Sequence, residues 1–297
     1  MNIPITFLGT GQAIPTPRRN HTSILLQYKD ENILIDCGEG TQRQIRKAKL
    51  NPCSITKLLI THWHGDHILG IPGLLQTLAL SGYNKQLEVY GPRGTLFHMN
   101  KIMNMFVFQG AIKYKVIEVE GKFFENSDFA LEALPMTHGA PCLAYSFIEK
   151  AKTRINKEKL EKLKIKGKII AQLAQGKDIL WNNKKIKAED LTYSQPEKKI
   201  SIILDTSLNK NMEKIAENAD LLICESTYTK KDEDASGFKY HLTAEQAAET
   251  AKKAKVKKLI LTHISQRYEF KEKFILAEAR KIFKNSEVVE DLSKVEV

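Results

Sequence analysis

The chain has 297 residues, of which 42% are hydrophobic and 27% are charged, a composition typical of a globular protein with a substantial core. This composition excludes wholesale disorder, and the lack of any run of about 18 apolar residues argues against a transmembrane helix. The formal net charge of +11 favours polyanionic partners, nucleic acid above all, although a genomic bias toward lysine would explain the same charge.

Short β-rich runs alternate with helical patterns along most of the chain. We predict strands at residues 5–9, 23–28, 32–36, 57–61, 87–90, 129–136, 142–147, 200–205, 221–225 and 258–262. We predict helices at residues 41–49, 71–80, 95–106, 209–219, 243–255 and 271–283. Short turns between the early strands indicate antiparallel hairpins, and the later alternation indicates layered α/β units. The predicted fold class is therefore α/β, with mixed sheets flanked by helices.

One segment breaks this rhythm. Residues 150–187 contain 13 lysines and arginines against 3 acidic residues, a local net charge of +10. Its few apolar residues suit one or two small helices, and Gly167 and Gly176 interrupt it. We predict a single domain over residues 1–297 that carries an inserted basic arm at about 150–190.

The clearest candidate site is the segment HWHGDH at residues 62–67, which directly follows the apolar run LLI and a threonine. It places three imidazoles and a carboxylate within six residues, and zinc accepts both groups as ligands at about 2.0–2.2 Å. With this composition, a chance HxHxDH match has a probability of roughly two in ten thousand. We therefore predict a metal site formed by His62, His64, Asp66 and His67.

Six residues cannot complete the coordination of two metal ions, so further ligands should lie at other strand ends. His138 follows the strand predicted at 129–136, Asp205 ends the one at 200–205, and His263 follows the one at 258–262. Active sites of α/β folds take their residues from such positions. We expect these three side chains to join the site, whereas His98, inside a predicted helix, should serve packing.

The order of these residues resembles the metallo-β-lactamase superfamily, and within it the chain resembles the ribonuclease Z family. Segments along almost the whole chain carry the resemblance: FLGTG at 7–11, PT at 15–16, RRN at 18–20, IDCGEGTQ at 35–42, GIPGL at 70–74, ESTY at 225–228, YHLTA at 240–244 and THISQRY at 262–268. The chain departs from the family at Leu204, at Ala144, and in the arm, where a Gly-Pro motif is missing after Gly167.

The resemblance implies a metallo-β-lactamase-like αββα sandwich of two mixed sheets, with the arm protruding as a tRNA-binding exosite. It also implies two Zn²⁺ per chain, one held by His62, His64 and His138, the other by Asp66, His67 and His263, with Asp205 bridging them. The implied activity is that of an endoribonuclease that removes the 3′ trailer from precursor tRNA. The products would be a tRNA 3′-hydroxyl and a trailer 5′-phosphate, and the implied assembly is a homodimer.

Catalytic roles can be assigned to three residues. Asp66, both ligand and hydrogen-bond acceptor, would orient or deprotonate the attacking water. The expelled ribose oxygen needs a proton, which we assign to His241, just before a predicted helix start in which Thr243 is the cap. Glu225 would keep that imidazole protonated. The alternative is that His241 only packs at the helix entry.

Seven basic residues are candidates for binding the substrate: Arg18, Arg19, Arg267, Lys162, Lys164, Lys166 and Lys168. Two other functions remain open, a phosphodiesterase or hydrolase of this fold acting on a small molecule, and a non-catalytic, metal-stabilised RNA-binding module. The first residues, MNIPITFLGTG, lack the basic and apolar regions of a secretory signal, so we expect a cytoplasmic protein.

Overall fold

The computed structural model describes residues 2–108, 110–182, 184–232 and 240–297. The chain forms two compact units. The main unit consists of the chain up to Phe124, Leu131–Phe147 and Lys199–Val297, and the smaller unit consists of Glu125–Ala130 and Ile148–Lys198. Among the described residues, no helix is long and apolar enough to cross a membrane.

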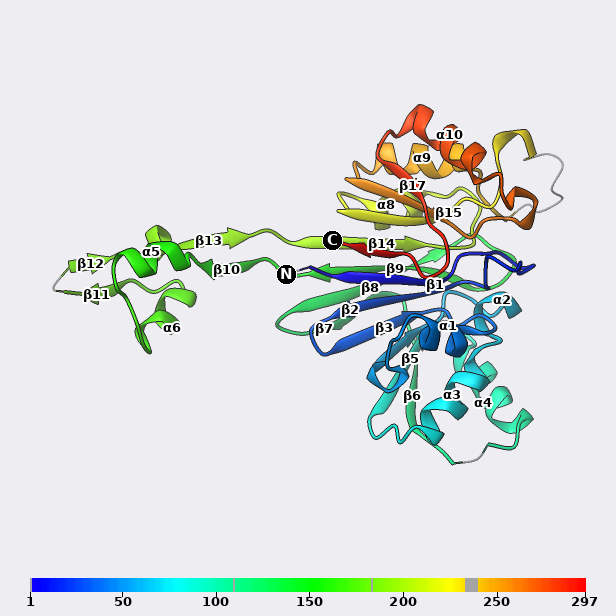
Figure 1. Ribbon diagram of the computed structural model, residues 1–297, viewed down its shortest axis with the longest axis horizontal. Helices are drawn as coiled ribbons and strands as arrows, with labels where there is room; N and C mark the ends of the chain where they lie inside the picture. Colours follow the sequence, from blue (N-terminus) through cyan, green and yellow to red (C-terminus); the bar gives the residue numbers. More distant parts are fainter. Residues whose placement is uncertain (1, 109, 183, 233–239) are drawn as a thin grey trace. The chain divides into compact units, whose positions relative to one another are not determined.

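Within the described residues, the main unit is built on two β-sheets (Figure 1). The first sheet has the order β18 (Lys294–Glu296), β1 (Pro4–Gly9), β2 (Ser23–Tyr28), β3 (Glu31–Ile35), β4 (Lys57–Leu59), β5 (Gln86–Gly91) and β6 (Lys113–Glu118). The second has the order β17 (Ser286–Val288), β16 (Lys258–Thr262), β15 (Leu221–Glu225), β14 (Lys198–Ile203), β9 (Cys142–Glu149), β8 (Phe129–Met136) and β7 (Gly121–Glu125). The first sheet is antiparallel from β18 to β3 and parallel from β3 to β6, and β14 to β17 of the second are parallel.

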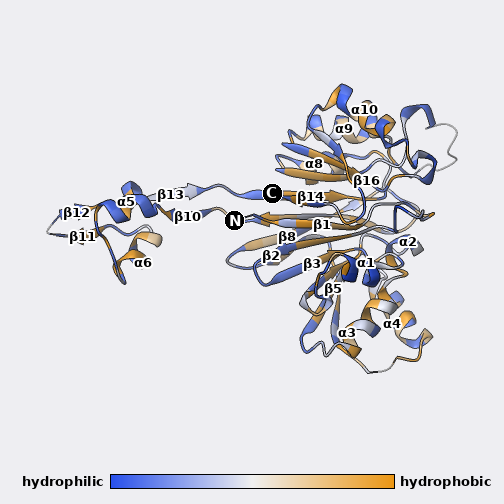
Figure 2. Cartoon of the chain, in the orientation of Figure 1, coloured by the Kyte–Doolittle hydropathy of each residue, from blue (hydrophilic) through white to orange (hydrophobic). Residues whose placement is uncertain are grey.

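Helices cover the outer face of each sheet (Figure 1). Those on the first sheet are α1 (Thr41–Lys47), α3 (Ile71–Leu80) and α4 (Thr95–Met105), and those on the second are α8 (Lys210–Ala216), α9 (Ala244–Lys253) and α10 (Glu272–Ile282). Hydrophobic residues are concentrated on the strands of both sheets and on parts of the helices beside them (Figure 2). The layers are therefore helix, sheet, sheet, helix, which confirms the αββα sandwich.

Helix α9 shows how the local sequence determines where a helix begins and which of its faces is buried. Thr243 Oγ1 accepts a hydrogen bond from the Gln246 backbone N–H at 3.2 Å, and Gln246 Oε1 accepts one from Thr243 N–H at 2.9 Å. This capping box satisfies backbone donors that a helix start leaves open. Four alanines, Ala244, Ala247, Ala248 and Ala251, line the buried face. The cap predicted at Thr243 is confirmed, and it places His241 two residues before that cap.

Five strands of the main unit end close to a predicted site residue. β4 ends before His62, β8 before His138, β14 before Asp205 and β16 before His263, while β15 ends at Glu225 itself. The predicted strands at 57–61 and 200–205 are each two residues too long at this end. There the backbone leaves the sheet, because Thr61 N–H donates to the Asp36 carboxylate and Thr206 N–H to the Glu225 carboxylate.

The smaller unit covers most of the predicted arm segment and contains helices, which were expected, and strands, which were not. Its helices are α5 (Lys157–Lys162), α6 (Ile169–Ala174) and α7 (Ala188–Leu191), and its strands pair as β10 (Lys152–Ile155) with β13 (Thr192–Gln195) and β11 (Ile179–Trp181) with β12 (Lys184–Ile186). Leu160, Ile165 and Leu173 belong to a small core of its own. That this unit acts as an arm stays a prediction.

Candidate metal centre

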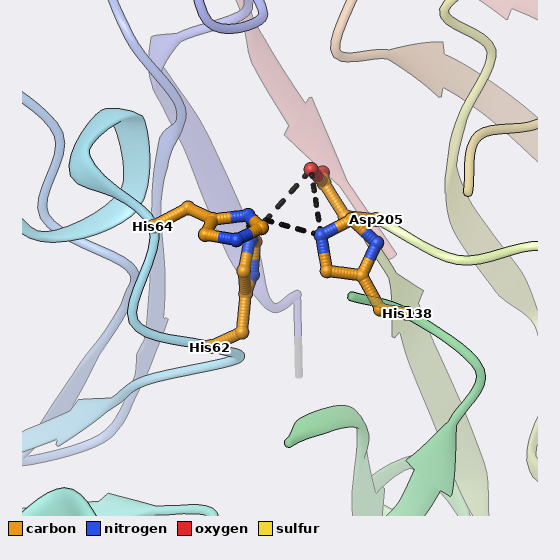
Figure 3. Close-up of side chains that lie close together, drawn as sticks. All are labelled: His62, His64, His138 and Asp205. Carbon is orange, nitrogen blue, oxygen red and sulfur yellow. Dashed lines mark hydrogen bonds and ion pairs between the residues drawn. The ribbon is translucent and has the colours of Figure 1, made fainter. Parts of the chain in front are cut away.

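Four ligand-type side chains converge at a first position: His62, His64, His138 and Asp205 (Figure 3). His64 Nδ1 lies 3.0 Å from His62 Nε2 and 3.0 Å from His138 Nε2. Asp205 Oδ2 lies 3.6 Å from His62 Nε2 and 3.9 Å from His138 Nε2. Ligands about 2.0–2.1 Å from a tetrahedral ion are roughly 3.3 Å apart, so these spacings suit a zinc-sized cation.

A second group of four lies beside it: Asp66, His67, His263 and Asp205. His67 Nε2 is 3.3 Å from Asp66 Oδ2, and His263 Nε2 is 3.5 Å from the same oxygen. Asp205 Oδ1 lies 3.3 Å from His67 Nε2 and 3.0 Å from His263 Nε2. Asp205 thus turns one oxygen to each group, as a residue shared by two cations would. The structure brings together all seven predicted ligands.

In His62 and His138, a hydrogen bond at Nδ1 explains why the opposite nitrogen, Nε2, faces the ligand cluster. Thr61 Oγ1 donates to Asp36, so it accepts from His62 Nδ1 at 3.1 Å. His138 Nδ1 donates to the Tyr240 carbonyl at 3.2 Å. In His62 and His138 the unprotonated Nε2 is therefore turned inward, which is the form that binds a metal.

His67 and His263 are oriented by buried acidic groups. His67 Nδ1 donates to Asp36 Oδ2 at 2.6 Å. Thr227 Oγ1 donates to Glu225 at 2.6 Å and accepts from His263 Nδ1 at 3.0 Å. Carboxylate–histidine–metal arrangements of this kind fix ring orientation and increase the basicity of the ligand.

The donor atoms themselves fit a cation. Among the described residues, His67 Nε2, Asp205 Oδ1 and His263 Nε2 are buried and make no hydrogen bond. Buried polar atoms without a hydrogen bond are costly, and a bound cation would satisfy all three. Burial raises the pKa of Asp205, but the His263 and His67 imidazoles outweigh it and hold the pKa well below its ordinary value. The ionised carboxylate is the ligating form, so the two groups are able to bind metal ions.

A cavity of about 310 Å³ opens over these ligands, and its wall includes Asp66, His138, Asp205, Tyr240 and His241. His241 Nδ1 lies 3.3 Å from Glu225 Oε2, so the predicted pair is in contact. Burial lowers the pKa of His241, but the Glu225 carboxylate outweighs it and raises the pKa above its ordinary value. The imidazolium is thereby favoured at the edge of the cavity.

Glu225 also has a structural role that the sequence did not reveal. Its Oε1 accepts from the Thr206 backbone at 2.8 Å, and its Oε2 accepts from Thr227. It therefore holds the loop after β14 and, through Thr227, the ring of His263. The position of Glu225 at a strand end was the available signal. Asp36 at the end of β3 carries the same signal, yet it was not predicted to belong to the site.

The remaining predicted residues lie in different environments, and not all of them can have the predicted role. His98 lies on α4, where it stacks on Trp63 at 4.8 Å between ring centroids, outside both metal groups. The substrate-binding role predicted for Arg19 is corrected by the structure. Its side chain is buried, and its Nη1 donates to Thr10 Oγ1 at 2.7 Å and to the Val289 carbonyl at 2.8 Å. Those bonds fasten the N-terminal loop to the C-terminal segment, so Arg19 is not available to a substrate.

Other candidate binding residues remain accessible. Arg18 is partly exposed, paired with Glu290 and stacked 4.8 Å from the ring of Phe270. Arg267 is exposed, with its guanidinium 5.1 Å from the centre of the Tyr228 ring. The four candidate lysines of the smaller unit, Lys162, Lys164, Lys166 and Lys168, are all exposed.

Comparison with known proteins decides the family. The chain is 41% identical to ribonuclease Z of Methanothermobacter thermautotrophicus over 99% of this chain and 96% of the relative, and 37% identical to ribonuclease Z of Enterococcus faecalis over 99% and 97%. The chain belongs to the ribonuclease Z family. The human tRNase Z, short form, superposes on this ribonuclease Z family member with a TM-score of 0.70, at 27% identity and over 98% of each chain.

Two further matches are less specific. The fold of this ribonuclease Z family member is shared by the metallo-β-lactamase fold protein YhfI of Bacillus subtilis, with a TM-score of 0.70 at 18% identity over 100% of this chain and 99% of the other. A family model described as anti-Pycsar protein Apyc1 matches residues 3–101, which include the HWHGDH segment. The predicted family and fold are both confirmed.

Proposed function

We propose that this chain is an endoribonuclease that removes the 3′ trailer from precursor tRNA. The observation that carries the proposal is the full-length similarity to ribonuclease Z, together with a complete set of metal ligands at the strand ends. The products are a tRNA with a 3′-hydroxyl and a trailer with a 5′-phosphate.

Two Zn²⁺ per chain are the metals that we assign to the centre. His62, His64 and His138 would hold one, Asp66, His67 and His263 the other, and Asp205 would serve both. When bound, zinc supplies Lewis-acid polarisation of the phosphate and activation of a water molecule near neutral pH. Imidazole and carboxylate ligands at tetrahedral spacing support zinc over magnesium, which prefers oxygen ligands alone.

Side chains of the protein accept and donate the protons of the reaction. The Asp66 carboxylate lies on the cavity wall, where it can orient the attacking water and accept its proton. His241 donates a proton to the ribose 3′-oxygen as that oxygen leaves. Glu225, in contact with His241 Nδ1 at 3.3 Å, holds the ring in place and favours its protonated form.

The two other functions considered are less well supported. A small-molecule phosphodiesterase would need neither the cluster of exposed lysines in the smaller unit nor the similarity to ribonuclease Z over 99% of the chain. A non-catalytic RNA-binding module would leave His241, on the cavity wall beside the metal ligands, without a use. Exposed lysines suit phosphate contacts, which position RNA without reading its sequence.

The smaller unit is the proposed tRNA-binding exosite, and Lys162, Lys164, Lys166 and Lys168 are its proposed phosphate contacts. A homodimer is the proposed assembly, in which one subunit's exosite serves the partner's centre. Precursor tRNA processing would place the enzyme in the cytoplasm.

Cleavage of a precursor tRNA by zinc-loaded protein, with both product ends mapped, tests the proposal. A single cut that leaves a 3′-hydroxyl on the tRNA and a 5′-phosphate on the trailer is expected. Cleavage of small phosphodiesters with no cut in the precursor would favour the small-molecule enzyme, and RNA binding without any metal-dependent cleavage would favour the binding module.

A further inference from the structure

A second cavity, of about 530 Å³, lies where the segments that follow β15 and β16 meet helix α10. It contains none of the metal ligands. Its size falls within the range of about 300–1,000 Å³ typical of small-molecule and cofactor sites. A cavity of this kind beside a catalytic centre is a candidate binding site.

Cationic side chains outnumber anionic ones on the wall of this second cavity. Four cations line the cavity, namely Arg267, Lys231, Lys271 and Lys281, against the two carboxylates of Asp232 and Glu278. None of the four cations forms an ion pair with another residue in the described part of the chain. The cavity therefore offers cationic donors that are suited to a phosphate group.

Both carboxylates are already engaged by other donors. Glu278 accepts from the backbone N–H of Lys230 at 3.0 Å and from that of Glu245 at 3.1 Å. Asp232 accepts from the Tyr268 hydroxyl. The two carboxylates thus already have donors of their own, and the four cations outnumber them on the wall.

An aromatic ring completes the wall. Phe274 lies on α10, lines the cavity and is 54% exposed, so its ring is open to a ligand. A nucleobase can stack on an exposed aromatic ring whatever its identity, since every base has a π-face. Cations for a phosphate and a ring for a base together suit a nucleotide.

The cavity is also close to the centre of reaction. The Arg267 guanidinium lies over the ring of Tyr228, and that ring meets His241 edge-on at 6.2 Å between centroids. One aromatic side chain thus connects the cavity wall to the residue that we assign to the leaving-group proton. Tyr228 is buried, so it separates the cavity wall from His241 by one side chain, and a nucleotide chain would reach the cavity over the exposed Arg267.

We propose that this cavity binds one nucleotide of the RNA substrate beside the scissile bond, with its phosphate on Arg267 and the neighbouring lysines and its base stacked on Phe274. The proposal rests on the proposed endoribonuclease function. Free nucleotides have the same chemistry, so the experiment includes them as a separate arm.

The test compares Phe274→Ala with Phe274→Tyr, which keeps an aromatic ring, and with Phe97→Ala, a matched control on α4 whose ring is 60% exposed. Stacking energies predict that Phe274→Ala raises the KM for precursor tRNA about 5- to 150-fold. Phe274→Tyr should keep a KM close to that of the unmodified enzyme. All three variants should hydrolyse a small chromogenic phosphodiester at the rate of the unmodified zinc-loaded enzyme.

The possible results of this comparison either support or overturn the proposed nucleotide site. A KM for precursor tRNA that is equal in Phe274→Ala and Phe97→Ala would overturn the proposal. So would calorimetry in which Phe274→Ala loses binding of uridine 5′-monophosphate while its KM for RNA is unchanged, because the cavity would then serve free nucleotides. If the unmodified enzyme does not cut precursor tRNA at all, the proposed function itself fails, and that result is distinct from the variant comparison.

Discussion

Asp36 Oδ2 accepts a hydrogen bond from His67 Nδ1 at 2.6 Å, and both side chains are fully buried. The same carboxylate accepts from the backbone and hydroxyl of Thr61, at 2.7 and 2.6 Å. One acid therefore holds His67 directly and, through the Thr61 hydroxyl, the ring of His62. The two rings belong to different metal groups, so Asp36 positions ligands of both.

Replacing Asp36 tests this role. We expect Asp36→Asn to weaken metal affinity about 10- to 100-fold, because an amide has one acceptor oxygen where the carboxylate uses two, one for His67 and one for the Thr61 backbone N–H. Asparagine suits the site sterically, since Asp36 has a positive φ of 55°. Competition with a metal-binding dye measures the affinity, and Asp30→Asn in the exposed β2–β3 turn is the matched control. Equal affinities in the two variants would show that Asp36 does not orient the ligands.

Asp205 should decide how many metals bind. Metal analysis of the purified protein should approach two zincs per chain. Asp205→Ala should reduce that number, because its two oxygens face different groups. Glu287→Ala, which removes a partly exposed carboxylate on β17, should keep both metals. Full occupancy in Asp205→Ala would contradict a shared ligand.

His241 should be needed for expulsion of the leaving group. We expect His241→Ala to lose about 10²- to 10⁴-fold in kcat with zinc content intact, the usual contribution of a general acid. A substrate with sulfur in place of the scissile 3′-oxygen needs little protonation, so on it the variant should nearly match the unmodified enzyme. His98→Ala, outside both metal groups, is the control histidine. A deficit of the same size on the sulfur substrate would leave His241 as a positioning residue.

The exposed lysines of the smaller unit should act by neutralising phosphates. Replacing Lys162, Lys164, Lys166 and Lys168 by alanine should raise the KM for precursor tRNA. It should also reduce the slope of log affinity against log salt by about 0.7–0.9 for each phosphate that the variant no longer neutralises. Hydrolysis of a small phosphodiester should not change.

The matched control for these lysines is alanine at four exposed lysines of the main unit, Lys214, Lys252, Lys253 and Lys255. Equal effects of the two quadruple variants on KM and salt slope would mean that general charge, and not the proposed exosite, attracts the RNA. Equal decreases in activity on RNA and on the small diester would instead point to a structural role for the smaller unit.

The candidate metal ligands could be predicted from the sequence because their signal is local. Four of them lie within the six residues 62–67, and His138, Asp205 and His263 each follow a hydrophobic strand pattern. The strands meet at one edge of the sandwich, so a residue at a strand end is carried to the site by the fold itself. The same rule applied to Asp36 would have found the residue that orients His67.

Only the tertiary structure decided which polar groups meet across the chain. Asp36 and His67 are 31 positions apart, and Arg19 reaches the Val289 carbonyl across 270 positions. Hydrophobic periodicity determines which face of a strand or helix is buried, but it contains no information about strand order or about which loops become neighbours. For that reason the residue pattern predicted mixed sheets flanked by helices and a set of candidate ligands, and the αββα sandwich followed from the family resemblance. The burial of Arg19 and the orientation of the imidazoles required the three-dimensional structure.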